Sequence, residues 1–231
     1  MTCQGAYRLP DPLADLEVRR CRIEMCQNPE QTSRGRRPRA RNVKLVRCHV
    51  TASELGPVFA EDCLVDTLWL HRGMWGPQRL AGSVFRHMTI RGSISGGLRF
   101  IAAWDWLLDS RIRLCDTDEA RANADFYAGV DWALDISAAE FSSVELTESG
   151  IPACLIRRDP DTQVVVDRKA AMEALRRRLE LPDPAWLVGL ERLVESGFDD
   201  TVLVAAKRGR RFAQQLASIA LLRDEGLTMP D

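Results

Sequence analysis

This sequence lacks the features that mark several large functional classes. It has no excess of charge, because 32 Lys and Arg residues balance 33 Asp and Glu residues to a net charge of −1. No overall field therefore favours nucleic acid or a basic partner. No apolar run approaches the roughly 20 residues that span a bilayer, and the N-terminus lacks the apolar core of a secretory signal. We expect a cytoplasmic protein without a membrane partner.

Metal-ligand spacing is missing as well. None of the seven cysteines forms a C-x-x-C pair, and the three histidines match no known ligand motif. We therefore expect no metal and no cofactor. Five cysteines fall in an inward column of the repeat described next, where a reduced thiol behaves as a small apolar side chain. These are Cys21, Cys26, Cys48, Cys63 and Cys154.

What the sequence does contain is an apolar position that returns every five residues from Leu45 to Phe100. Eleven of its twelve members are apolar, Ser95 being the exception. A second column, two residues earlier, is small or apolar except at Gln78. A period of five fits neither a helix nor a flat strand and indicates strands stacked in successive turns of the chain. The apolar column consists of Leu45, Val50, Leu55, Ala60, Val65, Leu70, Trp75, Leu80, Phe85, Ile90, Ser95 and Phe100.

The two columns resemble those of the pentapeptide-repeat family. Proteins of that family are square, right-handed β-helices in which a large apolar residue and the small residue two before it point inward. The sequence departs from the family in lacking the usual Ala-Asp/Asn-Leu triplet, and in placing bulky Val58, Leu68 and Met88 where small residues are usual. The resemblance implies a mainly β fold with some α structure: a short right-handed β-helix, or solenoid, followed by a C-terminal helical region.

We expect two regions along the chain. Residues 1–157 are predicted to form the β-solenoid, with insertions at 29–42 and 101–123, and residues 158–231 an α-helical capping or flanking region. Apolar spacing and helix-stop residues place the helices. The expected helices are 118–127, 168–179, 184–195 and 209–223, with a strand at 164–166 and a strand or buried loop at 201–205.

The repeat also predicts neighbours on the outer surface. Residues twenty apart are expected to stack on one wall, which would bring Leu64 beside Val84. Trp69 would stand in the same apolar outer strip. Because an apolar strip of this kind is unusual on a solvated surface, we expect helices or the 101–123 segment to cover it.

Two basic clusters are candidate binding sites. Basic side chains can grip phosphates, but no aromatic residue is interleaved with the first cluster, which weakens a single-strand nucleic-acid interpretation. A solvated insertion is the alternative. The first cluster comprises Arg34, Arg36, Arg37, Arg39 and Arg41, and the second comprises Lys207, Arg208, Arg210 and Arg211.

A third candidate site lies where the repeat breaks, at Trp104, Asp105, Trp106 and Asp109. Paired carboxylates beside aromatic rings are typical of sugar-binding or acid–base sites. This segment supports the hypothesis of an enzyme or a small-ligand binder.

No catalytic constellation stands out, so our first hypothesis is a non-catalytic bacterial protein-binding module with a target-protection, immunity or regulatory role. The family resemblance implies this class, because some pentapeptide-repeat proteins protect DNA topoisomerases by presenting an acidic, DNA-like rod. The present chain is neutral and carries arginine clusters, so it departs from that pattern. Nucleic-acid binding and a ligand site at Trp104–Asp109 stay open, as does homodimerisation through the last turn or the helical region.

Overall fold

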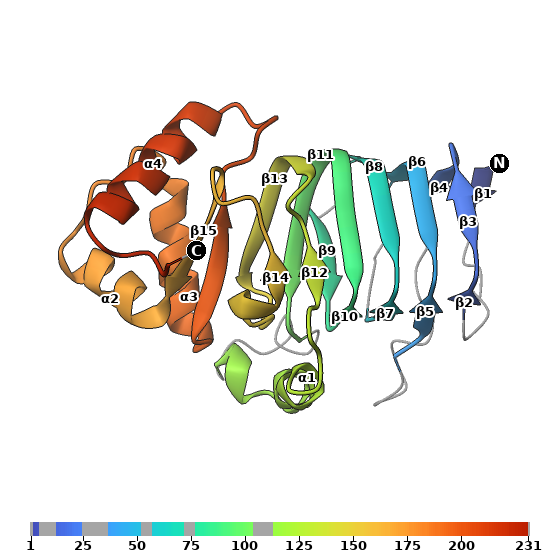
Figure 1. Ribbon diagram of the computed structural model, residues 1–231, viewed down its shortest axis with the longest axis horizontal. Coiled ribbons are helices and arrows are strands. Elements are labelled where there is room, and N and C mark those ends of the chain that lie inside the picture. Colours follow the sequence, from blue (N-terminus) through green and yellow to red (C-terminus); the bar gives the residue numbers. More distant parts are fainter. Residues whose placement is uncertain are drawn as a thin grey trace.

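The protein was analysed as a computed structural model in which parallel sheets and helices combine in an α/β-like arrangement (Figure 1). One sheet has ten strands and another has four, and all strand pairs within these two sheets are parallel. A separate antiparallel pair, four α-helices and two short 3-10 helices, Leu114–Asp116 and Ala153–Leu155, complete the regular structure of the described residues. The residues that the structure describes are 2–4, 13–24, 37–51, 57–71, 77–103 and 113–230.

The predicted fold class is wrong. We expected a mainly β fold, a short right-handed β-helix with a helical C-terminal region. The structure instead combines parallel sheets with helices. In the C-terminal region, strands β15 (Gln163–Asp167) and β16 (Asp200–Val204) lie where the sequence predicts a strand and a strand or buried loop. The five-residue spacing indicates which side chains point from the strands into the interior of the protein. It does not define how the strands and helices are grouped into sheets and layers.

The chain passes repeatedly between the two parallel sheets. In the ten-stranded sheet, β6 (Lys44–Thr51) pairs with β8 (Leu64–His71) at an interval of twenty residues, and β8 pairs with β11 (Met88–Ile101) at twenty-five, before a register shift within β11. Strand β5 (Arg39–Arg41) lies in the segment that we expected to be an insertion. The other strands of the ten-stranded sheet are β1 (Thr2–Gln4), β3 (Glu17–Arg19), β4 (Arg22–Glu24), β9 (Gln78–Ala81), β12 (Leu134–Asp135), β13 (Ala139–Glu148) and β14 (Ile156–Arg157). The four-stranded sheet comprises β2 (Leu13–Ala14), β5, β7 (Phe59–Glu61) and β10 (Val84–Arg86).

The repeat predicts the interior well, with one shift. Val50, Phe85 and Phe100 of the apolar column are buried. Ser95 is partly exposed, and Ile94, which is 0% exposed, faces the interior in its place. The cause is an irregularity in the pairing of β8 and β11 between Arg91 and Ile94, which moves the inward position by one residue.

The cysteines follow the prediction in part. Cys21, Cys48 and Cys63 are buried, as expected for inward positions. Cys154 is exposed instead, because it lies in a short 3-10 turn, Ala153–Leu155, rather than in a strand. Cys26 lies outside the described residues.

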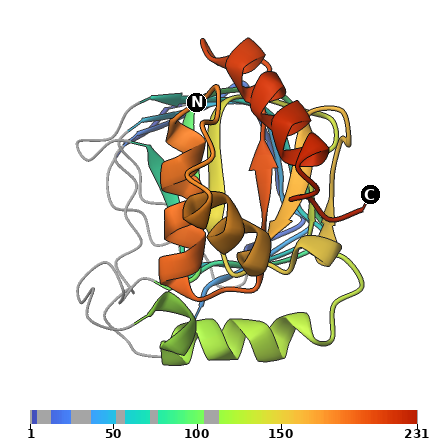
Figure 2. The same ribbon diagram turned by 90° about the vertical axis from the view of Figure 1, so that its left-hand side faces the viewer.

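The four helices lie where the apolar spacing predicts them. The Thr117 side chain accepts a hydrogen bond from the Ala120 N–H, and Asp167 accepts one from Ala170 N–H, so both residues satisfy backbone donors at helix N-termini. Figure 2 shows α3 (orange) and α4 (red) in front of the strands, so the C-terminal helices cover one end of the strand array. The bounds are α1 (Asp118–Tyr127), α2 (Arg168–Arg176), α3 (Ala185–Ser196) and α4 (Phe212–Asp224).

A charged network joins these helices to the strands. The Arg192 guanidinium of α3 lies 2.8 Å from the Glu145 carboxylate of β13. Glu145 lies 3.3 Å from Arg99 of β11, and Arg99 Nε donates at 2.9 Å to Glu148, which is only 3% exposed. The network fixes α3 against the last long strands of the sheet.

No helix within the described ranges is both long and apolar enough to cross a membrane. The cellular compartment and the boundary between the two regions at residue 157 stay predictions.

Candidate functional site

Three aromatic rings gather on the outer surface of β6 and β8, and we call His49, Trp69 and His71 the ring cluster. Side chains in a strand alternate between its two faces. Because Cys48 and Val50 are buried, His49 faces outward. The same alternation along β8 turns Trp69 and His71 outward, and the strand register places Trp69 directly opposite His49. Sheet geometry therefore assembles the cluster.

The rings of the cluster are ordered by contacts with one another. His49 stacks on Trp69 with ring centroids 4.6 Å apart and planes 13° apart. Nδ1 of His49 and Nε2 of His71 are 3.2 Å apart, and the two ring planes differ by 11°. The ring centroids of His49 and His71 are 5.5 Å apart. This separation is close to the N–N distance plus the distance from each nitrogen to the centre of its own ring, so both nitrogens lie near the line that joins the two ring centres. The two nitrogens therefore meet head-on, in the geometry of an N–H···N hydrogen bond.

Small residues lie beside the ring cluster on the next strand. The register places Ser95 of β11 opposite Trp69, and Gly96 and Gly97 follow it. All three are partly exposed. Only Ser95 lies directly opposite Trp69. A side chain at Gly96 would meet Leu70, and one at Gly97 would meet Pro77. A small residue therefore lies beside the partly exposed Trp69 ring.

A second polar cluster surrounds His87, and we call Asp62, His87 and Asp131 the His87 bridge. Its members come from three consecutive layers of chain, because the Asp62 N–H donates to the Arg86 carbonyl and the His87 N–H to the Trp132 carbonyl. His87 Nδ1 lies 3.0 Å from an Asp62 oxygen, and Nε2 lies 2.7 Å from Asp131. Only a protonated imidazole can donate from both nitrogens.

The electrostatics of the His87 bridge agree with this geometry. The hydrogen bond to Asp131 raises the pKa of His87, partial burial opposes the shift, and the bond to Asp62 adds to it. The same bond from His87 lowers the pKa of Asp131. The Trp132 ring lies 4.8 Å from the imidazole, and the Arg157 guanidinium lies 4.1 Å from the centre of Trp132. Since both ring nitrogens are hydrogen-bonded, His87 links the layers of the chain that carry Asp62 and Asp131.

We predict that the His87 bridge weakens as the pH rises. Because the folded-state pKa of His87 is raised, its contribution to stability is complete below the ordinary value of about 6.5 and is lost as the pH rises through the higher folded value. The difference in unfolding free energy between the wild type and His87→Asn should therefore shrink above about pH 6.5. It should stay below about 1 kcal/mol, because Asp131 is 75% exposed. Denaturant titrations at several pH values measure this difference.

The Asp131 side of the bridge gives the control. Because the pKa of Asp131 is lowered in the folded protein, its contribution to stability is present above the ordinary value of about 3.9. That contribution is lost as the pH falls through the lower folded value. Asp131→Asn should reproduce most of the loss seen in His87→Asn near neutral pH. A difference between the wild type and His87→Asn that is the same below about pH 6.5 as at alkaline pH would contradict the predicted protonated bridge.

The described arginines of the first basic cluster contact other residues of the same chain. The Arg37 guanidinium donates to the side-chain oxygen of Asn123 in α1 and lies 3.7 Å from Glu119. The other two arginines extend from β5. Arg39 lies over the Phe59 ring at 5.9 Å, and Arg41 lies 3.6 Å from Glu61. Arg34 and Arg36 lie outside the described residues.

Two residues of the second basic cluster also form ion pairs within the chain. Lys207 lies 2.9 Å from Asp159, and Arg211 lies 2.8 Å from the buried carboxylate of Asp183. The side chains of Arg208 and Arg210 are exposed. Nucleic-acid binding through the two clusters stays a prediction.

The third candidate site cannot be placed. Trp104, Asp105, Trp106 and Asp109 all lie outside the described residues, so the enzyme or small-ligand hypothesis stays a prediction as well. Among the residues that are described, no three His, Cys, Asp or Glu side chains converge as they would around a metal ion.

Sequence reasoning missed the ring cluster although a signal for it was present. His49 and Trp69 are twenty residues apart, which is the interval between β6 and β8. The twenty-residue interval does not hold between β8 and β11. Leu64 pairs with Thr89, twenty-five residues later, and not with Val84 as predicted. Trp69 is partly exposed and packs on His49. Its coverage by helices or by the 101–123 segment stays a prediction, because residues 104–112 lie outside the described residues.

Comparisons with protein-family models, with curated proteins and with solved structures find no match for this chain. The function must therefore be argued from its own surfaces.

Proposed function

We propose that this chain is a non-catalytic protein-binding module whose partner docks on the ring cluster. The observation that carries the proposal is the partly exposed Trp69, held against His49 on the outer face of a parallel sheet. Tryptophan is enriched among the few residues that dominate binding energy at protein interfaces. A ring that is already ordered in the free protein loses little conformational entropy on binding.

The surroundings of Trp69 define the partner's chemistry. Trp69 is partly exposed beside the small Ser95, so we expect an apolar side chain of the partner to contact the indole. His71 is exposed and hydrogen-bonded to His49, so it offers a polar group at the edge of the apolar contact. An apolar centre with a polar rim is the usual anatomy of a protein–protein interface.

Site-specific photo-crosslinking in the organism that supplies the sequence tests the proposal. A benzophenone amino acid at His71 should capture one protein, whereas the same group at Leu16, which is also exposed, should not. With that protein purified, Trp69→Ala should weaken binding by about 30-fold or more, which corresponds to the 2 kcal/mol that defines a hot spot. The Leu16→Ser variant is the matched control and should bind as the wild type does.

Two outcomes would contradict the proposal. One is equal capture at His71 and Leu16. The other is unchanged affinity for the captured protein in Trp69→Ala. Retention of DNA or RNA that falls steeply with salt would instead favour the nucleic-acid alternative. The identity of the captured protein would decide between target protection, immunity and regulation.

A further inference from the structure

Two buried thiols meet near the N-terminal end of the strand array, and we call Cys21 and Cys48 the thiol pair. Cys21 lies between β3 and β4, and Cys48 lies in β6. Both β3 and β4 pair with β6 at an interval of twenty-seven residues, so Cys21 stands directly opposite Cys48. Their sulfur atoms are 3.3 Å apart, and the two residues are 7% and 0% exposed.

Cys48 has Cys21 on one side and an apolar residue on the other. On the neighbouring strand β8 it lies opposite Leu68. The Cys48 sulfur also lies 3.5 Å from the Val46 carbonyl oxygen. Because that carbonyl already accepts a hydrogen bond from the Arg20 N–H at 2.9 Å, it keeps a donor when the Cys48 thiol loses its proton.

The backbone at the thiol pair already suits a disulfide. Neighbouring strands lie about 4.8 Å apart, and a disulfide usually joins Cα atoms that are roughly 4.4–6.8 Å apart. The sulfur atoms have only to close from 3.3 Å to a bond of about 2.05 Å. We infer that the thiol pair is a redox site, at which a hydroperoxide converts the two thiols into a disulfide that fastens the N-terminal strands to β6.

The reaction consumes one hydrogen peroxide for each disulfide, in two steps. The Cys21 thiolate attacks one peroxide oxygen, the O–O bond breaks, and a sulfenic acid forms at Cys21 as water leaves. The Cys48 thiolate then attacks the Cys21 sulfur, the S–S bond forms, and the sulfenic oxygen leaves as a second water. The two thiols together give up two electrons and two protons, and the peroxide is reduced.

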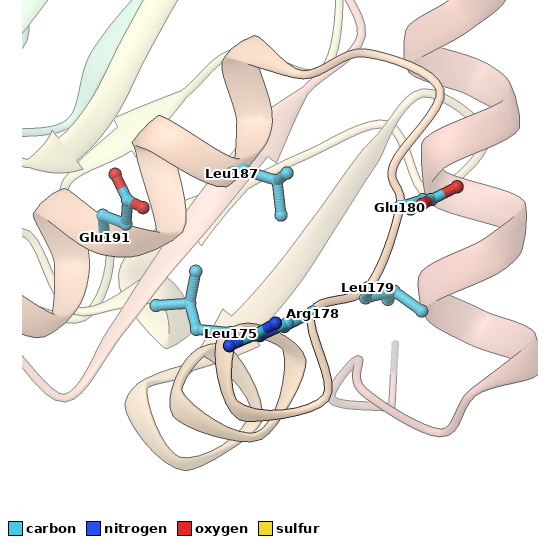
Figure 3. Close-up of a pocket in the computed structure, with 6 residues that line it drawn as sticks. All are labelled: Leu175, Arg178, Leu179, Glu180, Leu187 and Glu191. Carbon is cyan, nitrogen blue, oxygen red and sulfur yellow. The ribbon is translucent and has the colours of Figure 1, made fainter.

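Access to the thiol pair depends on the edge of the strand array. The pocket of about 250 Å³ that Leu175 of α2 and Leu187 of α3 line (Figure 3) lies at the other end of the molecule and does not lead to the pair. Within the described residues, β3 pairs only with β6. Strands at the edge of a structure open more readily than its core, so opening of β3 exposes Cys21 to the oxidant first.

A bond at Cys21 holds two strands at once. Cys21 lies directly between β3 and β4, and β1 pairs with β4 in turn. A link from Cys21 to β6 therefore opposes the opening of β3 and β4 and, through β4, of β1. The inference does not rest on the partner proposed for the ring cluster, because Cys48 faces the interior whereas His49 faces outward.

Peptide mapping of the full chain after treatment with hydrogen peroxide tests the inference. The remaining thiols are alkylated, and cleavage after glutamate then places Cys21 on a peptide of residues 18–24 and Cys48 on a peptide of residues 31–54, each with no second cysteine. The two peptides should be recovered joined by a disulfide from protein that runs as a monomer on a non-reducing gel.

Cys63 is the internal control of the mapping experiment. It is buried like Cys48, but its sulfur lies 3.4 Å from the carbonyl oxygen of Ala40 and 3.2 Å from that of Glu61. Burial also raises the pKa of the Cys63 thiol, which reduces the thiolate that reacts with peroxide. The Cys63 thiol should therefore stay open to alkylation after denaturation.

Hydrogen exchange measures the effect on the N-terminal strands. Amide exchange of residues 17–24 should slow by about 30-fold or more on oxidation, the lower end of the usual effect of a disulfide, and should recover with dithiothreitol. Cys48→Ala should exchange at the same rate with and without peroxide, whereas Cys63→Ala should respond as the wild type does. Circular dichroism establishes that each variant is folded.

Three results would overturn the inference. One is recovery of both wild-type peptides alkylated and unlinked after peroxide treatment. Another is Cys21 joined to a cysteine other than Cys48. The third is unchanged exchange of residues 17–24 in wild-type protein that carries the Cys21–Cys48 disulfide.

Discussion

Replacing Arg99 by alanine should lower the free energy of unfolding by about 3–5 kcal/mol. Glu148 is 3% exposed and receives its side-chain hydrogen bonds from Arg99. The substitution leaves a buried carboxylate without its compensating charge, and desolvation of that charge is then unopposed. Arg99 also lies 3.3 Å from Glu145, which holds Arg192 of α3. Denaturant titration followed by circular dichroism measures the change.

Two control variants distinguish the loss of the buried ion pair from the loss of an exposed arginine on the same strand. Arg91 of β11 lies 2.9 Å from Asp66, but its side chain is 52% exposed, so Arg91→Ala should cost less than about 1 kcal/mol. The double variant Arg99→Met/Glu148→Leu removes both members of the buried pair and should recover most of the stability. Equal losses for Arg99→Ala and Arg91→Ala would show that the buried network does not stabilise the fold as we argue.

Replacing Gly96 by alanine should cost about 2–5 kcal/mol. Gly96 has a φ of +86°, and a Cβ placed there would be 2.2 Å from the carbonyl oxygen of Leu70 on β8. A left-handed backbone conformation costs roughly 1–2 kcal/mol in a residue with a side chain. Forcing β8 and β11 apart costs about 1–3 kcal/mol more, as overpacking does in protein cores.

Gly226 supplies the matched control for Gly96. It also has a positive φ, of +66°, but nothing lies within 4 Å of the position that its Cβ would take. Gly226→Ala should therefore cost only the conformational penalty of roughly 1–2 kcal/mol. Thermal or denaturant unfolding of the two variants tests the difference. Similar losses at both sites would contradict the close contact between β8 and β11.

Much of the interior could be predicted from the sequence. The five-residue column correctly marks Val50, Phe85 and Phe100 as buried, because apolar side chains at regular intervals must share one side of the strands. Apolar spacing and helix-stop residues also placed the helices near their observed positions. The prediction failed at Ser95, where an irregular pairing with β8 moves the inward position to Ile94. Nothing in the spacing signals that shift.

The candidate sites were harder to predict than the core. The sequence drew attention to runs of arginine, but four of those arginines contact their own chain, as Arg41 contacts Glu61 and Arg211 contacts Asp183. The ring cluster and the His87 bridge join residues that are twenty or more positions apart, such as His87 and Asp131. The repeat indicates the twenty-residue interval that places Trp69 opposite His49, but it does not indicate that the interval changes between β8 and β11.

By itself, the sequence determined most of the side chains that face inward, the approximate positions of the helices, and that charge is balanced over the chain. Tertiary structure alone decided the grouping of strands into two parallel sheets with helices, and with it the fold class. It also decided which outward residues become neighbours, because the interval between paired strands changes from twenty residues at β6 and β8 to twenty-five at β8 and β11. Inward burial depends on local alternation, whereas outward contacts depend on register between strands distant in the chain.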